Sequence, residues 1–338
     1  MDVAIHPITL NLRTTFRIAH GASDTRSNIL LQLGDGWGEA APVSYHGESA
    51  EHVAAWLEQH RPILEAADDP AALRWILSRL DSSSRAARAA VDLALHDALG
   101  KRLGVNVRTL LGLDGLAAPP TSFTLPIGDP DELREQAAAA AHYPILKIKL
   151  GGPADLASIA VIREAAPLSR LRVDANGGWT FAIAQGMIPA LVEQGVELIE
   201  QPLPADDIEG YHALHTAGYA IPIFADEPIK SAADVARWAG IVDGVNIKLM
   251  KTGGIVGALA AIETARAHGL QVMLGCMIET GVGVAGAVAL AGLADFVDLD
   301  GPLLIDNDPT TGLSFEGAQV VPLAGPGLGV EVRPPAAD

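Results

Sequence analysis

Apolar and polar residues alternate along roughly the first 50 positions, as in the segment NILLQLGDGWGEA, and this spacing predicts antiparallel strands. Within that segment, Gly34-Asp35-Gly36 is typical of a hairpin turn. Apolar residues from Ala86 to Leu99 then recur at helical spacing, and we expect this helix to end at Gly100. The first part of the chain is therefore predicted to be an α+β lobe.

After Pro119-Pro120 the pattern changes to short apolar segments, each followed by an Ala-rich amphipathic segment, which is typical of βαβ units and a parallel sheet. Eight apolar segments end 22 to 28 residues apart, at Ile127, Leu150, Ala175, Gln201, Glu227, Leu249, Met277 and Leu299. This interval is about the length of one strand, one helix and two short loops. Eight such units predict a closed barrel, because a doubly wound sheet would need fewer strands.

The eighth apolar segment is followed by Gly301-Pro302 and by a tail to Asp338 that is rich in Gly and Pro. We therefore expect the last helix to be short or missing and the tail to pack back on the first lobe. The predicted fold class is α/β. It consists of a modified (β/α)7β barrel in residues 116–305 and an α+β capping domain in residues 1–115, completed by the tail in residues 306–338.

Composition and charge narrow the possible partners. The chain has 49% hydrophobic and 19% charged residues, as in globular proteins. Its 23 basic and 41 acidic side chains give a net charge of −18, which repels nucleic acid and anionic membranes. The apolar stretch Thr280 to Ala294 is too short to span a bilayer. Because Cys276 is the one cysteine and no signal peptide is visible, we expect a cytoplasmic protein. We also predict a homo-oligomer.

Acidic residues follow three neighbouring strands of the predicted barrel. Asp174, Glu200 and Asp226 lie 26 residues apart, each at the C-terminal end of a strand, where barrel active sites form. Three converging carboxylates need a cation, and oxygen ligands without His or Cys favour Mg²⁺. Each acid could instead cap the next helix, but their equal spacing favours the metal site.

Lysines stand on either side of this predicted metal site. Lys147 and Lys149 lie on one face of their strand, and Lys248 lies four strands away, across the mouth. Like charge and burial lower a lysine pKa, so a neutral amine near pH 7 becomes possible. Two bases on opposite sides of one carbon suit a racemase or epimerase. Lys251 is predicted to be an ordinary surface lysine.

The segments KIK, DAN, EQP, ADE and NIKLMKTGG, in this order, resemble the muconate-lactonizing subgroup of the enolase superfamily over nearly the whole chain. AVDLALHDALGKRLG, followed by LLG, resembles the helical part of that family's capping domain. The resemblance implies one Mg²⁺ on Asp174, Glu200 and Asp226, with Lys149 and Lys248 as the acid/base pair. It also implies supporting roles for Lys147 and Asn176, and an enediolate formed when the substrate loses its α-proton.

A further acidic pair indicates the substrate. Asp298 and Asp300 share one face of the eighth strand at the mouth and could pair with a substrate ammonium. This Asp-x-Asp resembles dipeptide epimerases, which implies a dipeptide substrate that is inverted at its C-terminal residue. The alternatives on the same scaffold are muconate cycloisomerase, o-succinylbenzoate synthase and N-acylamino acid racemase. A non-catalytic binding protein is disfavoured, because no lysine or metal ligand is lost.

Two capping loops are predicted to set specificity. The segment FRIAHG resembles L-Ala-D/L-Glu epimerases, which commonly carry an Arg there, whereas this chain has His20 and Gly21. We therefore expect side chains beyond glutamate to be accepted, with Arg17 or Arg26 as possible replacements for the missing Arg. The opposite wall is predicted to include Tyr45, His46 and Glu48.

Residues after the seventh strand are also predicted to face the substrate. Met277, Ile278, Glu279 and Thr280 precede the segment GVGVAG, which fits the dinucleotide-binding pattern GxGxxG. That pattern normally belongs to a first βαβ unit, and here it lies in the seventh. We therefore expect a substrate-lining loop and disfavour an NAD site.

Overall fold

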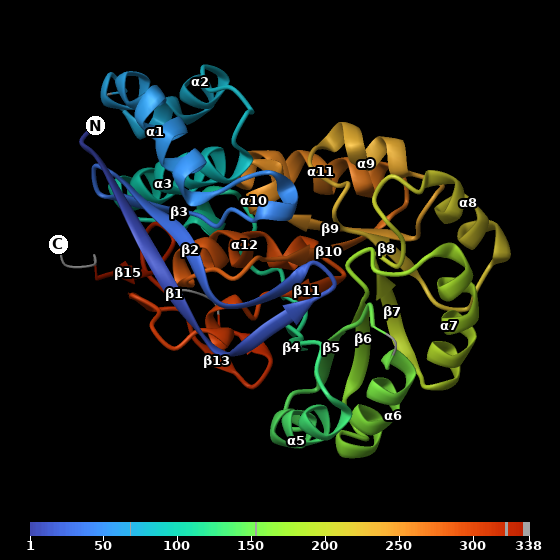
Figure 1. Ribbon diagram of the computed structural model, residues 1–338. Helices are drawn as coiled ribbons and strands as arrows, with labels where there is room; N and C mark the ends of the chain where they lie inside the picture. Colours follow the sequence, from blue (N-terminus) through green and yellow to red (C-terminus); the bar gives the residue numbers. More distant parts are fainter. Residues whose placement is uncertain (68, 153, 322–323, 334–338) are drawn as a thin grey trace.

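A three-stranded antiparallel sheet and a layer of helices form the N-terminal part of the protein (Figure 1). The computed structural model describes residues 1–338 except 68, 153, 322–323 and 334–338. The strands are β1 (Val3–Ile18), β2 (Gly21–Leu33) and β3 (Gly36–Ala40). The helical segments are η1 (Ser44–His46), α1 (Ala50–Glu65), η2 (Pro70–Ala72), α2 (Leu73–Ser78), α3 (Arg85–Leu103) and α4 (Val107–Leu110).

The predicted hairpin joins β2 to β3 through Gly34 and Asp35, so this prediction is confirmed. Helix α3 packs closely against β3. A Cβ atom on Gly38 would lie only 1.9 Å from the carbonyl oxygen of Ala90 in α3. Glycine at this position therefore allows the helix to approach the sheet.

Helix α3 continues beyond the end predicted for it, so the prediction that Gly100 ends the helix is wrong. The helix reaches Leu103 and ends at Gly104, which has a left-handed φ of 70° that favours glycine. Gly100 serves packing instead. A Cβ atom there would lie 2.7 Å from the Cα atom of Gly327 in the C-terminal tail.

Eight parallel strands form the second sheet in sequential order from β4 to β11. A parallel bridge between Thr121 and Val297 connects the two ends of this sheet, and Ser122 N–H donates to the Val297 carbonyl across the same seam. The predicted barrel is therefore confirmed. Its strands are β4 (Phe123–Leu125), β5 (Ile145–Lys149), β6 (Arg170–Asp174), β7 (Val196–Glu200), β8 (Ile223–Ala225), β9 (Gly244–Lys248), β10 (Gln271–Gly275) and β11 (Phe296–Asp298).

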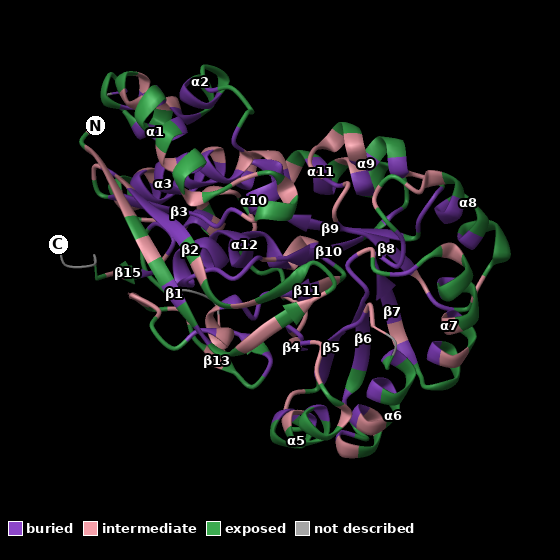
Figure 2. Ribbon diagram, viewed as in Figure 1, coloured by how far each residue is buried: buried purple, intermediate pink, exposed green. Residues whose placement is uncertain are grey.

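Helices surround the barrel and bury their inner faces, while their outer faces are exposed (Figure 2). After β11 the short 3-10 segment η4 (Gly301–Leu304) takes the place of an eighth helix, as the sequence predicted. The remaining helical segments are α5 (Pro130–Ala140), α6 (Asp155–Ala165), α7 (Phe181–Glu193), α8 (Ile208–Ala217), α9 (Ala232–Trp238), α10 (Leu249–Thr252), α11 (Ile255–Ala267), α12 (Gly281–Leu290) and η3 (Ala291–Leu293).

The C-terminal tail contacts the N-terminal part of the chain. Leu328 N–H donates to Asp97 Oδ1 at 2.7 Å, and the second oxygen of Asp97 accepts from Trp37 N–H on β3. Asp97 thus joins the tail, α3 and the first sheet. The tail strands are β12 (Thr310–Thr311), β13 (Phe315–Glu316), β14 (Gln319–Val320) and β15 (Glu331–Val332). Among the described helices, none has the length and apolar character needed to cross a membrane.

An apolar layer inside the barrel supports the polar residues at its mouth. Leu198, Phe224 and Met273 are fully buried there, and the ring of Phe296 packs against them. Phe224 and Phe296 meet edge to face, with ring centroids 5.4 Å apart. This packed layer fixes the height at which the next inward-facing residues of each strand stand.

Candidate active site

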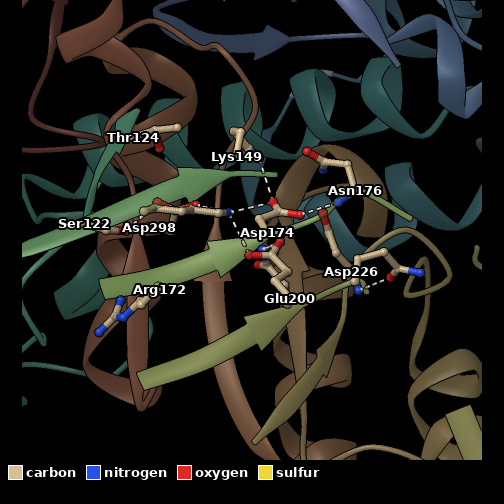
Figure 3. Close-up of polar contacts among 12 residues, drawn as sticks. Ser122, Thr124, Lys149, Arg172, Asp174, Asn176, Glu200, Asp226 and Asp298 are labelled. Carbon is tan, nitrogen blue, oxygen red and sulfur yellow. Dashed lines mark hydrogen bonds and ion pairs between the residues drawn. The ribbon is translucent and has the colours of Figure 1, made fainter. Parts of the chain in front are cut away.

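The register of neighbouring strands places three carboxylates together at the mouth of the barrel. Asp174 on β6 pairs with Glu200 on β7, and Asp226 follows the end of β8. One oxygen from each carboxylate lies within 4.8 Å of the other two, and all three residues are buried. Figure 3 shows these carboxylates pointing toward one another.

The charges around this triad favour a divalent cation. Burial and the charge of Asp174 raise the pKa of Glu200 to about 7. Glu200 Oε2 lies 2.7 Å from Lys147 Nζ but accepts no well-directed hydrogen bond. A buried carboxylate oxygen without a directed donor is costly. Oxygen ligands of this kind fit a hard ion such as Mg²⁺.

The three lysines expected at the mouth contact its acidic residues. Lys149 Nζ lies 2.6 Å from Asp174 Oδ2, and Lys248 Nζ lies 2.8 Å from Asp226 Oδ2. Lys147 lies deeper and contacts Asp174 at 3.1 Å. Burial alone would raise the pKa of Asp174, but the positive charges of Lys149 and Lys147 lower it to about 2.

The lysine charges differ from those expected from the sequence. Burial alone would lower the pKa of Lys147, but Asp298, Glu200 and Asp174 raise it well above its ordinary value. Burial would also lower the pKa of Lys248, but the charge of Asp226 raises it well above its ordinary value. The expectation of a lowered pKa is therefore wrong for Lys147. It counted like charge and burial but not the carboxylates that the fold places beside each ammonium.

Lys251 was missed by the sequence analysis. The prediction of a surface lysine is wrong, because Lys251 is buried and its ammonium donates to Asp226 Oδ1, to the Asp226 carbonyl and to the Asn246 carbonyl. Asn246 in turn donates from Nδ2 to Glu200 Oε1 at 2.8 Å. The available signal was its position three residues after Lys248, which places both on the same side of a helical turn.

The Asp-x-Asp pair at the end of β11 is buried, and its two members differ in their partners. Asp298 accepts hydrogen bonds from Ser122 Oγ and Lys147 Nζ, both at 2.6 Å. Asp300 accepts from the backbone N–H of Thr124 at 2.7 Å. Burial and the neighbouring charge of Asp298 raise the pKa of Asp300 to about 7. Among the described residues, no cationic side chain lies within ion-pair distance of Asp300.

One cavity of about 60 Å³ brings most of the expected residues together. Arg26 enters it from strand β2, where the sequence predicted a loop, and Tyr45 enters it from η1. Asn176 also lines this cavity, and its backbone N–H donates to Asp174 Oδ1 at 2.9 Å. The other expected residues that line this cavity are Lys147, Lys149, Lys248, Met277, Ile278, Asp298 and Asp300.

Glu279 and Thr280 do not line this cavity, in contrast to the prediction. Glu279 Oε1 turns back to accept from Met277 N–H at 2.7 Å, and Thr280 Oγ1 donates to Glu39 Oε2 at 2.6 Å. Burial and Glu39 raise the pKa of Glu279 to about 8. Thr280 therefore anchors the loop to β3, whereas Glu279 is bonded within the loop itself.

The hairpin of β1 and β2 and the segment from Pro42 to Tyr45 form a second cavity of about 270 Å³ beside the first. His20 lines this second cavity and stacks on Tyr45, with ring centroids 4.9 Å apart. Arg26 lines both cavities and donates to the Thr25 carbonyl, whereas Arg17 is exposed and lines neither.

The two remaining loop residues lie outside both of these cavities. Glu48 accepts from the backbone N–H groups of Arg85 and Ala86 and thereby caps α3. His46 lines an adjacent cavity, where burial and Lys251 lower its pKa to about 3.

The glycine-rich segment forms the buried helix α12 and leaves no space for a dinucleotide phosphate. Asp308 accepts from Gly281 N–H, and Glu39 accepts from Gly283 N–H. A Cβ atom on Gly286 would lie 2.1 Å from Leu93 Cδ2. These glycines permit close packing against the capping helices and β3.

Comparison with known families agrees with this site. Residues 1–112 match the mandelate racemase / muconate lactonizing enzyme N-terminal domain, and residues 132–337 match the enolase C-terminal domain-like family. The chain belongs to the mandelate racemase and muconate lactonizing enzyme family of the enolase superfamily. The resemblance identified from the sequence motifs is therefore confirmed.

Several members of this family are similar over almost the whole chain. The hydrophobic dipeptide epimerase of Roseobacter litoralis is 40% identical, covering 97% of this chain and 98% of the relative. The L-Ala-D/L-Glu epimerase of Bacteroides thetaiotaomicron is 38% identical, covering 98% and 88%. A solved dipeptide epimerase from Enterococcus faecalis, complexed with Mg and L-Leu-L-Tyr, has a TM-score of 0.89 and 30% identity, covering 97% and 98%.

Proposed function

We propose that the protein is a Mg²⁺-dependent dipeptide epimerase, an isomerase that inverts the α-carbon of the C-terminal residue. The observation that carries this proposal is one cavity lined by two lysines from strands four apart and by an acidic pair. Lys149 and Lys248 lie beside an acidic triad, and Asp300, just after β11, has no cationic partner within the described part of the chain. The names of the relatives support the same activity.

Asp174, Glu200 and Asp226 would hold one Mg²⁺ per subunit. When bound, the ion would supply positive charge to the substrate carboxylate while the α-proton is absent. The carboxylates that raise the pKa of Lys248 belong to this same ligand set. The proposed metal site and the charge state of the lysine are therefore coupled.

The two lysines perform the proton transfers in this proposal. The neutral amine of one lysine removes the α-proton from one face, and the ammonium of the other donates a proton to the opposite face. Lys147 holds Asp298 in place, and Asn176 holds Asp174. These contacts keep the reacting groups at fixed height around the substrate.

The Asp298 and Asp300 pair favours a dipeptide over the substrates of the alternative enzymes. An acylated amino acid, a muconate or a succinylbenzoate precursor offers no ammonium to Asp300. That buried carboxylate would then remain without a cation, which costs free energy or forces it into the neutral form. A free dipeptide supplies the missing positive charge.

Specificity for the C-terminal side chain is assigned to the second cavity. It adjoins the lysines through Ile18, Arg26, Val43 and Tyr45, which line both cavities. Arg26 offers a cation to glutamate, while His20 replaces the Arg common in glutamate-specific relatives. We therefore expect side chains beyond glutamate to be accepted.

A library of L,L-dipeptides incubated with the protein and Mg²⁺ in D₂O tests this proposal. Substrates gain one deuterium, which mass spectrometry detects, and chiral chromatography locates the inverted residue. N-acetylated copies of the same dipeptides provide the matched control. Efficient exchange of the acetylated copies alone would favour an N-acylamino acid racemase. The homo-oligomer stays a prediction, which light scattering on a sizing column would test.

A further inference from the structure

A groove of about 490 Å³ lies outside the catalytic cavity, between β1, α5 and η4. Its floor includes Phe123, on which the ring of Tyr143 stacks with centroids 4.5 Å apart and planes 8° from parallel. Leu12 and Leu303 form apolar walls from β1 and η4. Aliphatic and aromatic groups are the ligands that such walls favour.

Two polar side chains along this groove contact the backbone. Arg13 Nε donates to the Leu303 carbonyl at 3.1 Å, and His142 Nδ1 is within 2.9 Å of the Ala139 carbonyl. Most of the residues that line the groove are apolar. The groove therefore offers mainly apolar surface.

The groove adjoins the acidic end of the catalytic cavity. Phe16, Thr124 and Leu304 line both spaces. The backbone N–H of Thr124 donates to Asp300 Oδ2 at 2.7 Å. Burial raises the pKa of Tyr143, and the negative charge of Asp300 raises it further. Asp300 therefore lies at the boundary between the catalytic cavity and the groove.

The catalytic cavity cannot enclose a dipeptide by itself. Its 60 Å³ is less than half the volume of a cavity that holds one benzene molecule, which is roughly 150 Å³. A substrate must therefore extend into neighbouring space. The second cavity adjoins the lysines and the C-terminal residue, whereas the groove adjoins Asp300 and the N-terminal residue.

We propose that the groove binds the N-terminal side chain of the dipeptide and selects large aliphatic or aromatic residues. This inference rests on the proposed function, in which Asp300 binds the substrate ammonium. The N-terminal α-carbon is bonded directly to that ammonium nitrogen. The side chain of that residue then lies beside Phe16 and Leu304. Burying an aromatic side chain there raises kcat/KM roughly ten- to hundredfold over alanine.

The test compares L-Phe-L-Ala with L-Ala-L-Ala, which share the residue to be inverted. Two variants place a large ring in the groove from opposite walls, Ala139→Trp on α5 and Thr14→Trp on β1, and both positions are exposed. Ala138→Trp is the matched control, because Ala138 is exposed on α5 and does not line the groove. The readout is the ratio of kcat/KM for the two dipeptides.

We expect the wild type to favour L-Phe-L-Ala, and either groove variant to lower the ratio at least tenfold. The control should keep the wild-type ratio. Equal efficiency with both dipeptides, or a ratio that neither groove variant changes, would overturn this inference and leave the proposed function intact. Absence of turnover with every dipeptide would overturn the proposed function and this inference together.

Discussion

Replacing Asp300 by asparagine removes one negative charge and keeps an oxygen to accept the Thr124 N–H. Asp300 is the more informative member of the acidic pair, because Asp298 also holds Lys147. A hydrogen bond between charged groups contributes roughly 1.5 to 3 kcal/mol, which corresponds to about one to two orders of magnitude in kcat/KM. We expect Asp300→Asn to show this loss with free dipeptides.

N-acetylated dipeptides complete this comparison, because they have no ammonium. The wild type should turn them over poorly, and Asp300→Asn should turn over the free and acetylated forms with similar efficiency. Asp306→Asn, an exposed change six residues away, is the matched control and should behave as wild type. If Asp300→Asn lowers kcat/KM equally for free and acetylated substrates, Asp300 does not bind the ammonium.

The pKa of Asp300 adds a pH dependence with a definite sign. Because burial and Asp298 raise that pKa to about 7, the carboxylate is ionised above pH 7 and becomes protonated as the pH falls. KM for free dipeptides should therefore rise about fivefold from pH 7 to pH 6, because the ionised fraction of Asp300 falls from about one half to about one tenth. Asp300→Asn should lose this component, and a KM profile identical to that of the wild type would contradict the assignment.

Three further changes test other parts of the structure. Glu200→Gln removes a proposed ligand and should weaken Mg²⁺ binding by more than roughly tenfold in calorimetry, whereas the exposed Glu209→Gln should not. Chelation by EDTA should stop turnover, and added Mg²⁺ should restore it. Gly38→Ala places a Cβ atom 1.9 Å from the Ala90 carbonyl and should lower the free energy of unfolding by about 1 to 3 kcal/mol in urea. Gly186→Ala, which meets no atom within 4 Å in α7, should raise it by about 0.5 to 1 kcal/mol.

The barrel could be predicted from the sequence because strand and helix lengths repeat regularly. Because one strand and helix unit takes about 26 residues, acids at that spacing lie at the same edge of the parallel sheet, and Asp174 pairs with Glu200 there. The end of α3 could not be predicted in this way. Gly100 and Gly104 both suit a helix end by local chemistry, and the contact of Gly100 with Gly327 comes from a tail segment that a local pattern does not place.

Contacts between distant segments limited the prediction of the site. The charges of Lys147 and Lys248 depend on carboxylates from other strands, which a local pattern does not place. Lys251 looked like a surface lysine because its partner Asp226 lies 25 residues away. Thr280 was expected at the substrate, but Glu39 on β3 holds it behind the cavity.

The claim that two lysines act on opposite faces of one carbon is tested most directly by proton exchange in single variants. Each epimer of one dipeptide substrate is incubated in D₂O with Mg²⁺ and Lys149→Ala or Lys248→Ala, and deuterium at the C-terminal α-carbon is followed by NMR. We expect no epimerisation in either variant, with exchange retained for one epimer in Lys149→Ala and for the other epimer in Lys248→Ala. Lys230→Ala, a partly exposed lysine, is the control and should epimerise normally. Full epimerisation by Lys149→Ala or Lys248→Ala would contradict the two-base mechanism.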